Sequence, residues 1–196
     1  MSVSPRAAGV ALTFDDGPDS HGTPRLLALL SRLRARATFF PIAGRATAHP
    51  RLIAAMLAAG HTVGVHCDQH IRHSDRDRAW LTADTDRALR ALRALGAAPS
   101  LWRTPWGDLA PWSQEVARAQ GLQIAGWTVD THDWRGDRAQ QMRFAIEDQL
   151  VPGAVVLAHD GIGPGARRET IDETLSLVAW IGAAAAARGL ALEALA

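Results

Sequence analysis

His66 and His70 stand four residues apart, a spacing that lets two imidazoles face one ion from a tight loop or from adjacent helical turns. A hydrolytic metal ion typically takes two or three histidines and a carboxylate, and it keeps one position open for water. Such a cation can lower the pKa of bound water to about 7, which makes a nucleophile at neutral pH. His66 is followed by Cys67 rather than by glutamate, so the pair departs from the metalloprotease pattern. By itself the spacing is also typical of two exposed histidines on a helix.

Asp15 and Asp16 could supply the carboxylate that the histidine pair lacks. Consecutive side chains on a strand point to opposite faces, so both carboxylates reach one site only where the strand breaks. Gly17-Pro18 provides such a break directly after them. Two neighbouring carboxylates repel, but a dication beside one of them and Arg103 near the other would keep both ionised. The alternative is an Asx-type turn, for which Asp-Asp-Gly-Pro is a common sequence.

The elements that must hold these residues alternate along the chain. Short apolar runs predict strands over residues 9–14, 37–42, 61–66, 100–105, 122–130, 154–160 and, as a short seventh strand, 190–195. Helical patterns predict helices over residues 23–36, 50–59, 75–95, 111–120, 136–150 and 169–188. Strands separated by such helices pair in parallel with right-handed crossovers. The pattern predicts one α/β domain over residues 1–196, a parallel barrel or a doubly wound sheet, and the strand count favours an irregular barrel.

Polar residues stand where the predicted strands end, which is the edge at which parallel α/β folds build their sites. The residues in these positions are Asp15, Asp16, His66, His70, Arg103, Asp130, Asp133, His159 and Asp160. If the sheet is parallel, all of these residues lie at the same edge of it. The sequence therefore predicts an active site at that edge.

Five short motifs in a fixed order carry a resemblance to a known family. They are Thr13-Phe14-Asp15-Asp16-Gly17, His66-Cys67-Asp68-Gln69-His70, Arg103-Thr104-Pro105-Trp106-Gly107, Asp130-Thr131-His132-Asp133-Trp134 and Leu157-Ala158-His159. In order and spacing they resemble the motifs of polysaccharide deacetylases, which form carbohydrate esterase family 4 and share the NodB homology domain. The resemblance implies a distorted (β/α)7 barrel of parallel strands with outer helices, in agreement with the strand pattern.

The resemblance also implies a role for each matching residue. One divalent transition metal ion, usually Zn²⁺ and alternatively Co²⁺, Ni²⁺ or Mn²⁺, would be held by Asp16, His66 and His70. Asp15 would be the general base that deprotonates the attacking water, and Arg103 would hold Asp15 ionised and oriented. His159 would be the general acid that protonates the departing amine, with Asp133 as its partner. These two charged partners would give the acid and the base the different protonation states that they need.

The same resemblance implies a pocket for the acetyl methyl group, lined by Leu157 with Trp134 beside it. The backbone N–H of Trp106 would be a second donor, with the metal, to the tetrahedral oxyanion. Trp106 and Trp134 are also expected to contact substrate, because flat aromatic faces suit the C–H faces of sugar rings. Cys67 stands where the family usually has Ser or Thr, and Trp106 where it has Tyr or Phe. Cys67 is expected to be a small buried side chain, the alternative being a soft additional ligand.

Composition narrows the classes of partner. The chain has 21 arginines, no lysine and 20 acidic residues, and a net charge of +1 with interleaved signs gives no signal for nucleic acid or membrane. The single cysteine excludes an intramolecular disulfide. The N-terminus has no apolar leader, and no run approaches the ~18 apolar residues of a membrane span, so we expect a cytoplasmic protein. Outside the motifs, His21, His49 and His73 are expected at the surface.

These patterns and the resemblance together predict a metal-dependent hydrolase that removes acetyl from an N-acetylated sugar, a chito-oligosaccharide or a related glycan. A relative of the same fold that hydrolyses a cyclic imide or ureide is the second interpretation. A non-catalytic glycan-binding domain is the third. Acetate release from N-acetylglucosamine oligomers separates the first interpretation from the second. No pattern in the sequence indicates an oligomeric state.

Overall fold

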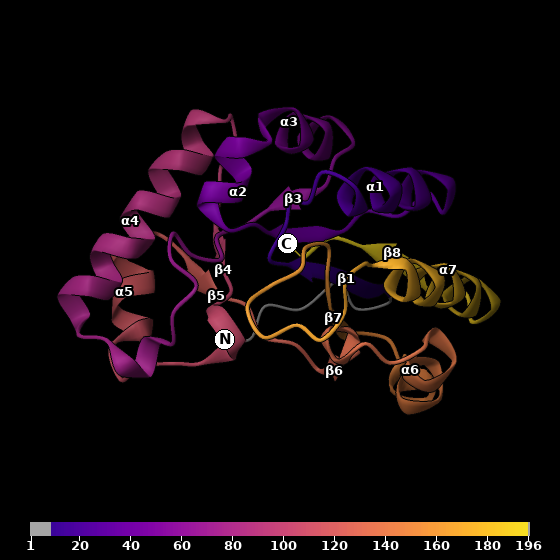
Figure 1. Ribbon diagram of the computed structural model, residues 1–196. Helices are drawn as coiled ribbons and strands as arrows, with labels where there is room; N and C mark the ends of the chain where they lie inside the picture. Colours follow the sequence, from indigo (N-terminus) through magenta and orange to yellow (C-terminus); the bar gives the residue numbers. More distant parts are fainter. Residues whose placement is uncertain (1–8, 196) are drawn as a thin grey trace.

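A parallel sheet forms the centre of the fold in a computed structural model that describes residues 9–195 (Figure 1). Its strands are hydrogen-bonded in the order β3-β2-β1-β7-β6, and all of these pairs are parallel, as predicted. Their bounds are Gly9–Asp15 for β1, Thr38–Phe40 for β2, Thr62–Val63 for β3, Val129–Asp130 for β6 and Val155–His159 for β7. The expectation about an N-terminal leader concerns residues 1–8, which lie outside the described part of the chain.

A second parallel pair continues the sheet, with β4 (Leu101–Trp102) beside β5 (Gln123–Ile124). A parallel bridge between Val65 and Trp102 joins this pair to the chain that leaves β3. Within residues 9–195, β5 pairs with β4 and β6 pairs with β7, but no pairing joins β5 to β6. The strands therefore form an irregular barrel with one open seam.

The prediction of a single strand over residues 122–130 is wrong, because residues 125–128 separate β5 from β6. The carbonyl groups of Ala125 and Gly126 accept hydrogen bonds from Nε and Nη2 of Arg103, over 3.2 Å and 2.9 Å. These carbonyls bind a buried side chain rather than a neighbouring strand. The break between β5 and β6 thus supplies two backbone acceptors to the buried guanidinium.

The predicted seventh strand is present as β8 (Ala191–Glu193), but it lies outside the order of the barrel. It pairs in parallel with residues 9–11, the first half of β1, while β2 pairs with residues 13–15 in the second half. β8 therefore lies at the end of the barrel away from the carboxyl ends of the strands. Because one predicted strand is split, β1 to β7 still supply the seven strands of the barrel in the described part of the chain.

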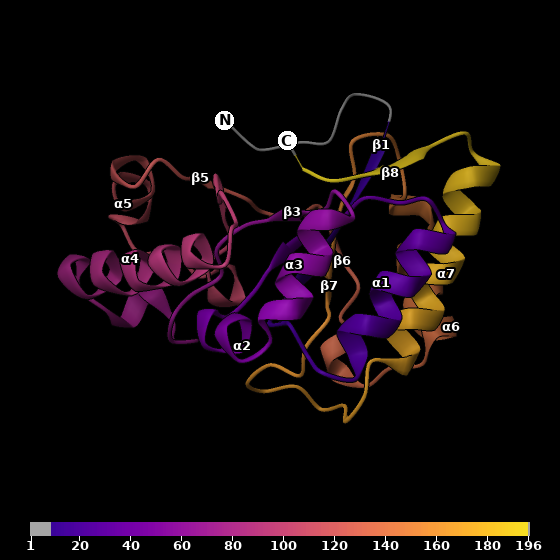
Figure 2. The same cartoon turned by 90° about the horizontal axis from the view of Figure 1, so that it is seen from above.

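Helices cover the outside of the strands (Figures 1 and 2). Their bounds are Gly22–Arg32 for α1, Ala43–Ala48 for α2, Pro50–Ala58 for α3, Arg78–Ala94 for α4, Ser113–Ala119 for α5, Ala139–Ile146 for α6 and Asp172–Ala187 for α7. α1, α7 and α6 lie side by side on one flank, and α4 lies with α5 on the other (Figure 1). The sequence patterns predict each of these helices except α2, whose six residues are too few to show a helical period. None of the helices within residues 9–195 is long and apolar enough to cross a membrane.

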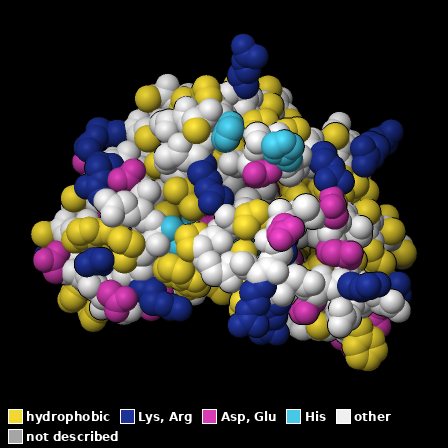
Figure 3. Space-filling model, viewed as in Figure 1, with side chains coloured by type: hydrophobic (Ala, Val, Ile, Leu, Met, Phe, Trp, Pro, Cys, Tyr) yellow, Lys and Arg dark blue, Asp and Glu magenta, His cyan; other side chains and the backbone are white. Residues whose placement is uncertain are grey.

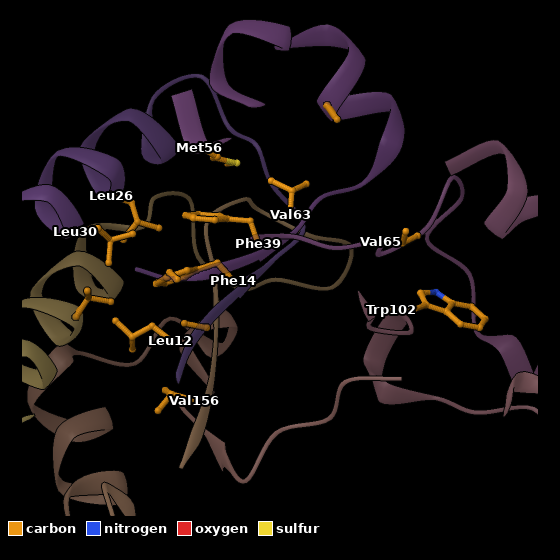
Figure 4. Packing of buried hydrophobic residues seen from close by; sticks show 14 of the residues in the cluster. Leu12, Phe14, Leu26, Leu30, Phe39, Met56, Val63, Val65, Trp102 and Val156 are labelled. Carbon is orange, nitrogen blue, oxygen red and sulfur yellow. The ribbon is translucent and has the colours of Figure 1, made fainter. Parts of the chain in front are cut away.

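Side-chain alternation along β1 divides the core in two. Val10, Leu12 and Phe14 belong to the larger buried cluster, which includes Leu26, Leu30, Phe39, Met56, Val63 and Val156 (Figure 4). Ala11 belongs to a smaller cluster with Phe40, Leu101, Ala125, Val155 and Leu195. By the same alternation Thr13 and Asp15 share the face of Ala11, which is the interior of the barrel. β1 therefore delivers the Asp15 carboxylate to the inside of the barrel at its carboxyl end.

Candidate active site

The carboxyl ends of the strands surround a pocket of about 410 Å³. Eight of the ten predicted site residues line it, namely Asp15, Asp16, His66, His70, Trp106, Trp134, Leu157 and His159. The other two lie behind the pocket wall, where Arg103 contacts Asp15 and Asp133 contacts His159. Tertiary structure thus brings all ten together from five separate motifs.

Asp16, His66 and His70 form a compact cluster in which one potential ligand atom from each lies within 4.8 Å of the others. His66 Nε2 lies 3.3 Å and His70 Nε2 lies 3.2 Å from the same oxygen, Asp16 Oδ1. That oxygen is buried and accepts no hydrogen bond within residues 9–195. A buried carboxylate oxygen facing two imidazole nitrogens fits a divalent cation, which takes this donor set.

The ring of His66 is held in the tautomer that a metal ligand needs. Its Nδ1 lies 2.7 Å from the carbonyl oxygen of Arg103, and a carbonyl only accepts, so Nδ1 carries the proton and donates it. In the neutral ring Nε2 then presents a lone pair toward Asp16. Burial acts to lower the pKa of His66, but the hydrogen bond to Asp16 and the charge of Asp15 raise it overall. Burial also acts to raise the pKa of Asp16, but the two histidines hold it well below its usual range.

The chain turns at Asp16, directly after the strand, and this turn brings the carboxylates of Asp15 and Asp16 to the same pocket. Asp15 ends β1 and faces the interior, and Asp16 has a left-handed backbone with a φ of 72°. This turn directs the second carboxylate to the same side as the first. Trp106 and His132 also have positive φ, at 55° and 54°, and Arg34 is the fourth such non-glycine residue in the part of the chain described. Such backbone conformations gather at functional sites, where surrounding contacts can hold them.

The Arg103 guanidinium is fully buried beside Asp15. Its Nη1 lies 3.1 Å from Asp15 Oδ1 and 2.6 Å from Thr13 Oγ1, and it donates to both. The guanidinium also lies 4.4 Å from the ring centre of Phe40 and 5.6 Å from that of Trp127. Burial lowers the pKa of Arg103 and the charge of Asp15 opposes this shift. The buried ion pair holds the Asp15 carboxylate at a fixed place in the pocket wall.

His159 and Asp133 form a second charged pair. His159 Nδ1 lies 2.7 Å from Asp133 Oδ1, and the backbone N–H of His159 donates to Asp133 Oδ2 over 3.0 Å. Burial alone would lower the pKa of His159, but the charge and hydrogen bond of Asp133 raise the pKa to about 9. Burial would raise the pKa of Asp133, and the charges of His159 and Arg168 hold it below its usual range. The imidazole is therefore protonated and its partner is ionised at neutral pH.

Three residues that support the site escaped the sequence patterns. Arg168 Nη1 donates to Asp133 Oδ2 over 2.8 Å, and its Nη2 donates to the His159 carbonyl over 3.0 Å. Arg45 donates to the carbonyl oxygens of Asp16 and Ile162, over 2.9 Å and 2.8 Å, and so joins the turn after β1 to loop 161–166. No local pattern marks either arginine, because both act on residues distant in the chain.

Asp84 is the third of these residues, and here a signal was present. It is buried on α4, where its carboxylate accepts the backbone N–H groups of Asp68 and Gln69 over 3.0 Å and 2.9 Å. Those two residues lie in the loop between His66 and His70. Asp84 stands on the face of α4 that includes Leu81 and Ala88, so a charged residue on an apolar stripe could have identified it.

Of the predictions for His73 and Cys67, which lie near the site in the sequence, one is wrong and one is confirmed. The prediction of a surface position for His73 is wrong, because this ring is fully buried and packs 5.3 Å from the ring centre of Trp102. Burial lowers the pKa of His73 to about 4, so its ring is neutral at physiological pH. The expectation for Cys67 is confirmed, since its side chain is buried. Burial raises the pKa of its thiol, which therefore stays protonated.

Tryptophans form the walls of the pocket. Trp106 is 44% exposed, and its ring lies 4.2 Å from that of His70 in an edge-to-face arrangement. Trp134 lies against His132, with 6.4 Å between ring centres, and Trp127 also lines the pocket. Trp102 is buried, and its Nε1 donates to the His66 carbonyl over 3.1 Å. Trp106 is exposed and Trp127 and Trp134 are half-buried, so these rings offer apolar surface to the pocket, while Trp102 supports the histidine loop from behind.

Comparisons with known sequences show which proteins this chain is similar to. The sequence profile of the polysaccharide deacetylase family matches residues 2–143. A chitooligosaccharide deacetylase of Bradyrhizobium sp. is 36% identical over 173 residues, which cover 84% of this chain and 76% of that protein. A peptidoglycan-N-acetylglucosamine deacetylase of Bacillus cereus is 34% identical over 160 residues, which cover 80% of this chain and 57% of that protein.

Comparisons with solved structures extend the likeness to the fold. A family 4 carbohydrate esterase from Streptomyces lividans in complex with acetate has a TM-score of 0.84 and 30% identity, over 94% of this chain and 91% of that chain. A peptidoglycan N-acetylglucosamine deacetylase in complex with a substituted benzamide has a TM-score of 0.90 and 28% identity, over 99% of this chain and 89% of that chain. The predicted distorted (β/α)7 barrel is thereby confirmed.

Proposed function

The chain belongs to the polysaccharide deacetylase family, carbohydrate esterase family 4, and we propose that it hydrolyses the acetamide group of an N-acetylated oligosaccharide with the help of a bound metal ion. One observation carries this proposal. A carboxylate held by a buried guanidinium, an imidazole held by a buried carboxylate, and an Asp–His–His cluster all meet at one pocket. Amide hydrolysis needs a base for the attacking water, an acid for the departing amine and a Lewis acid for the carbonyl oxygen. The carboxylate, the imidazole and a metal ion in the Asp–His–His cluster could supply these in turn.

We assign the metal ion to Asp16, His66 and His70, and we propose zinc as that ion. Two imidazoles and one carboxylate form a donor set typical of catalytic zinc, and the unpartnered Asp16 Oδ1 supports this assignment. When bound, such an ion polarises a carbonyl and makes water more acidic. The Arg103 carbonyl holds His66 in the required tautomer.

Asp15 is the proposed general base. It stands next to Asp16 in the chain, and the Arg103 guanidinium 3.1 Å away offsets the cost of burying its charge. An ionised carboxylate in this position can take a proton from water as the water attacks the acetamide carbon.

His159 is the proposed general acid. Its Nδ1–H is bound by Asp133, and a pKa of about 9 leaves a second proton on Nε2 at neutral pH. Nε2 can pass this proton to the amine that departs. Arg168 and Thr174 also donate to Asp133 Oδ2, so these contacts favour the ionised form of Asp133 and leave the proton on the imidazole.

The acetyl group is proposed to bind beside Leu157 and Trp134. Leu157 is buried in β7 two residues before His159, and both residues line the pocket. The backbone N–H of Trp106 is the proposed protein donor to the oxyanion. Trp106 and Trp134 would contact the sugar rings with their exposed faces.

The test is acetate release from an N-acetylglucosamine tetramer by zinc-loaded protein. Asp15→Asn is expected to lower kcat by about 10²–10⁴-fold, because it removes the base. Its zinc content should stay unchanged in elemental analysis, whereas His66→Ala should lose zinc. The matched control is Asp148→Asn, an exposed position outside the pocket that should keep both activity and metal.

Full activity in Asp15→Asn would exclude Asp15 as the base, and retained zinc in His66→Ala would exclude the ligand assignment. Ring opening of a cyclic imide or ureide without acetate release would establish the second interpretation in place of the first. Binding of the tetramer without any hydrolysis would indicate a glycan-binding domain.

A further inference from the structure

The rim of the pocket carries a stacked pair of Arg72 and Trp106. Both residues line the pocket, and the Arg72 guanidinium carbon lies 4.8 Å from the ring centre of Trp106. The same indole lies 4.2 Å from the ring of His70, a member of the Asp–His–His cluster. Arg72 is thus one aromatic ring away from the cluster, which is close enough to meet a sugar adjacent to the acetamide.

Arg72 differs from Arg103 and Arg168 in making no direct ion pair within residues 9–195, although the charge of the Asp108 carboxylate acts on it. Arg103 is paired with Asp15, and Arg168 is paired with Asp133. Within residues 9–195 the exposed Arg72 guanidinium makes no hydrogen bond or ion pair, and its close contact is the Trp106 ring. Its N–H groups can therefore donate to an oxyanion while its charge lies over the aromatic ring.

Hydrogen bonds between two turns hold Arg72 and Trp106 beside each other. Asp108 Oδ2 accepts the backbone N–H and the hydroxyl of Ser74, each over 2.8 Å, and so ties the segment after Arg72 to the turn of Trp106. Trp106 itself has the uncommon φ of 55° that directs its ring to the rim. The stack is therefore a preorganised surface rather than two independent side chains.

The acidic groups that line the pocket have partners of their own. Asp15 is bound by Arg103, Asp16 belongs to the proposed metal site, and Asp130 accepts the backbone N–H of His132 over 2.8 Å. Figure 3 shows arginine and acidic side chains interleaved over one face of the molecule rather than gathered by sign. Selection by charge would therefore act locally at the rim and not through the field of the whole protein.

We propose that Arg72 and Trp106 form a subsite for a negatively charged substituent on the sugar next to the acetamide that is hydrolysed. Trp106 offers the exposed part of its ring to the sugar, and Arg72 pairs with the oxyanion through its free N–H groups. The preferred substrate is then an acidic N-acetylated glycan rather than a neutral one. This inference rests on the proposed function, whose metal site and catalytic pair lie in the same pocket.

The test compares three tetramers of equal length as substrates of zinc-loaded protein at low ionic strength. One is neutral N-acetylglucosamine tetramer, one carries a carboxylate-bearing ether on alternate sugars, and one carries a sulfate ester at those positions. The wild type is expected to have a higher kcat/KM for at least one charged tetramer than for the neutral one. The tetramer that shows this preference identifies the oxyanion that the subsite takes.

Arg72→Gln is expected to lower the charged-over-neutral ratio of kcat/KM about fivefold, the effect of one exposed ion pair at low salt. Arg72→Lys should give an intermediate ratio, because lysine keeps the charge but loses the planar fork. Arg76→Gln is the matched control, since Arg76 stacks on Trp80 at 5.3 Å and does not line the pocket. Its ratio should equal that of the wild type.

A wild-type ratio of one or less for both charged tetramers overturns the inference, and so does a ratio that is unchanged in Arg72→Gln. The Kd of each tetramer, measured by calorimetric titration, gives the same ratio without hydrolysis. If no tetramer releases acetate, the proposed function fails, while the Kd ratio still decides whether the charged subsite exists.

Discussion

Asp133 and Arg103 are both fully buried charges, and each forms an ion pair with a residue in the pocket wall. The carboxylate of Asp133 raises the pKa of the neighbouring imidazole, and the guanidinium of Arg103 donates a hydrogen bond to Asp15 over 3.1 Å. Arg168 and Thr174 add two more hydrogen bonds to Asp133, which compensate the cost of burying it. The proposed acid and base can therefore be charged in opposite senses within one pocket.

The pKa of His159 provides a test at the residue scale. In metal-free protein we expect its imidazole to titrate at about 9, above the value of about 6.5 in the unfolded chain. The Asp133 pair should therefore stabilise the fold fully below about pH 6.5, and this contribution should be lost as the pH rises through about 9. Asp133→Asn should lower the pKa of His159 and remove this pH dependence.

NMR titration of the imidazole and urea unfolding at pH 6 and pH 10 measure the two effects. Asp130→Asn is the control, because Asp130 contacts His132 rather than His159. An unchanged His159 pKa in Asp133→Asn would show that another group holds its proton.

At the scale of secondary structure, the strands and helices place these residues in one site. β1 presents Asp15 because its side chains alternate, and this local property follows from sequence periodicity. α4 was also predictable from its apolar stripe, although it begins at Arg78 and not at residue 75, because Asp77 caps it by accepting the N–H of Trp80 over 2.7 Å. The partner of its buried Asp84 was not predictable, because the loop that Asp84 binds lies 15–16 residues earlier in the chain.

Asp84→Asn tests whether α4 supports the proposed metal site. The change should weaken the hydrogen bonds to the loop between His66 and His70, and we expect zinc affinity to fall about tenfold. Competition with a coloured chelator measures the Kd. Asp86 lies on the same helix but is half-exposed and paired with Arg90, so the Kd of Asp86→Asn should match the wild type. Equal zinc affinity in the Asp84 and Asp86 variants would exclude a role for α4 in metal binding.

At the scale of the whole molecule, the two ends of the described chain meet at one strand. β1 pairs with β2, with β7 and with β8, so its position depends on segments from both halves of the chain (Figure 2). Strands that depend on each other in this way should unfold together. We therefore keep a single domain over residues 1–196 as our proposal.

Metal binding should raise the free energy of unfolding of the whole chain. A cation that binds the native cluster alone, at a thousandfold excess over its Kd, adds about 4 kcal/mol to the free energy of unfolding. For a chain of this size the midpoint should rise by roughly 10 °C. Calorimetry with zinc and with a chelator measures the shift, which Asp16→Asn should remove and Asp148→Asn should keep. Two separate transitions in the same scans would contradict the single domain.

The sequence by itself determined the parallel α/β class, the strand ends that carry the chemistry and the five motifs, because strand alternation, helical period and motif spacing are local properties. Only the tertiary structure decided that residues 125–128 separate β5 from β6, that His73 is buried, and that Arg45, Asp84 and Arg168 brace the site. Each of these outcomes depends on a contact between segments that are distant in the chain. Such contacts follow from strand register and helix packing, and no local period in the sequence encodes them.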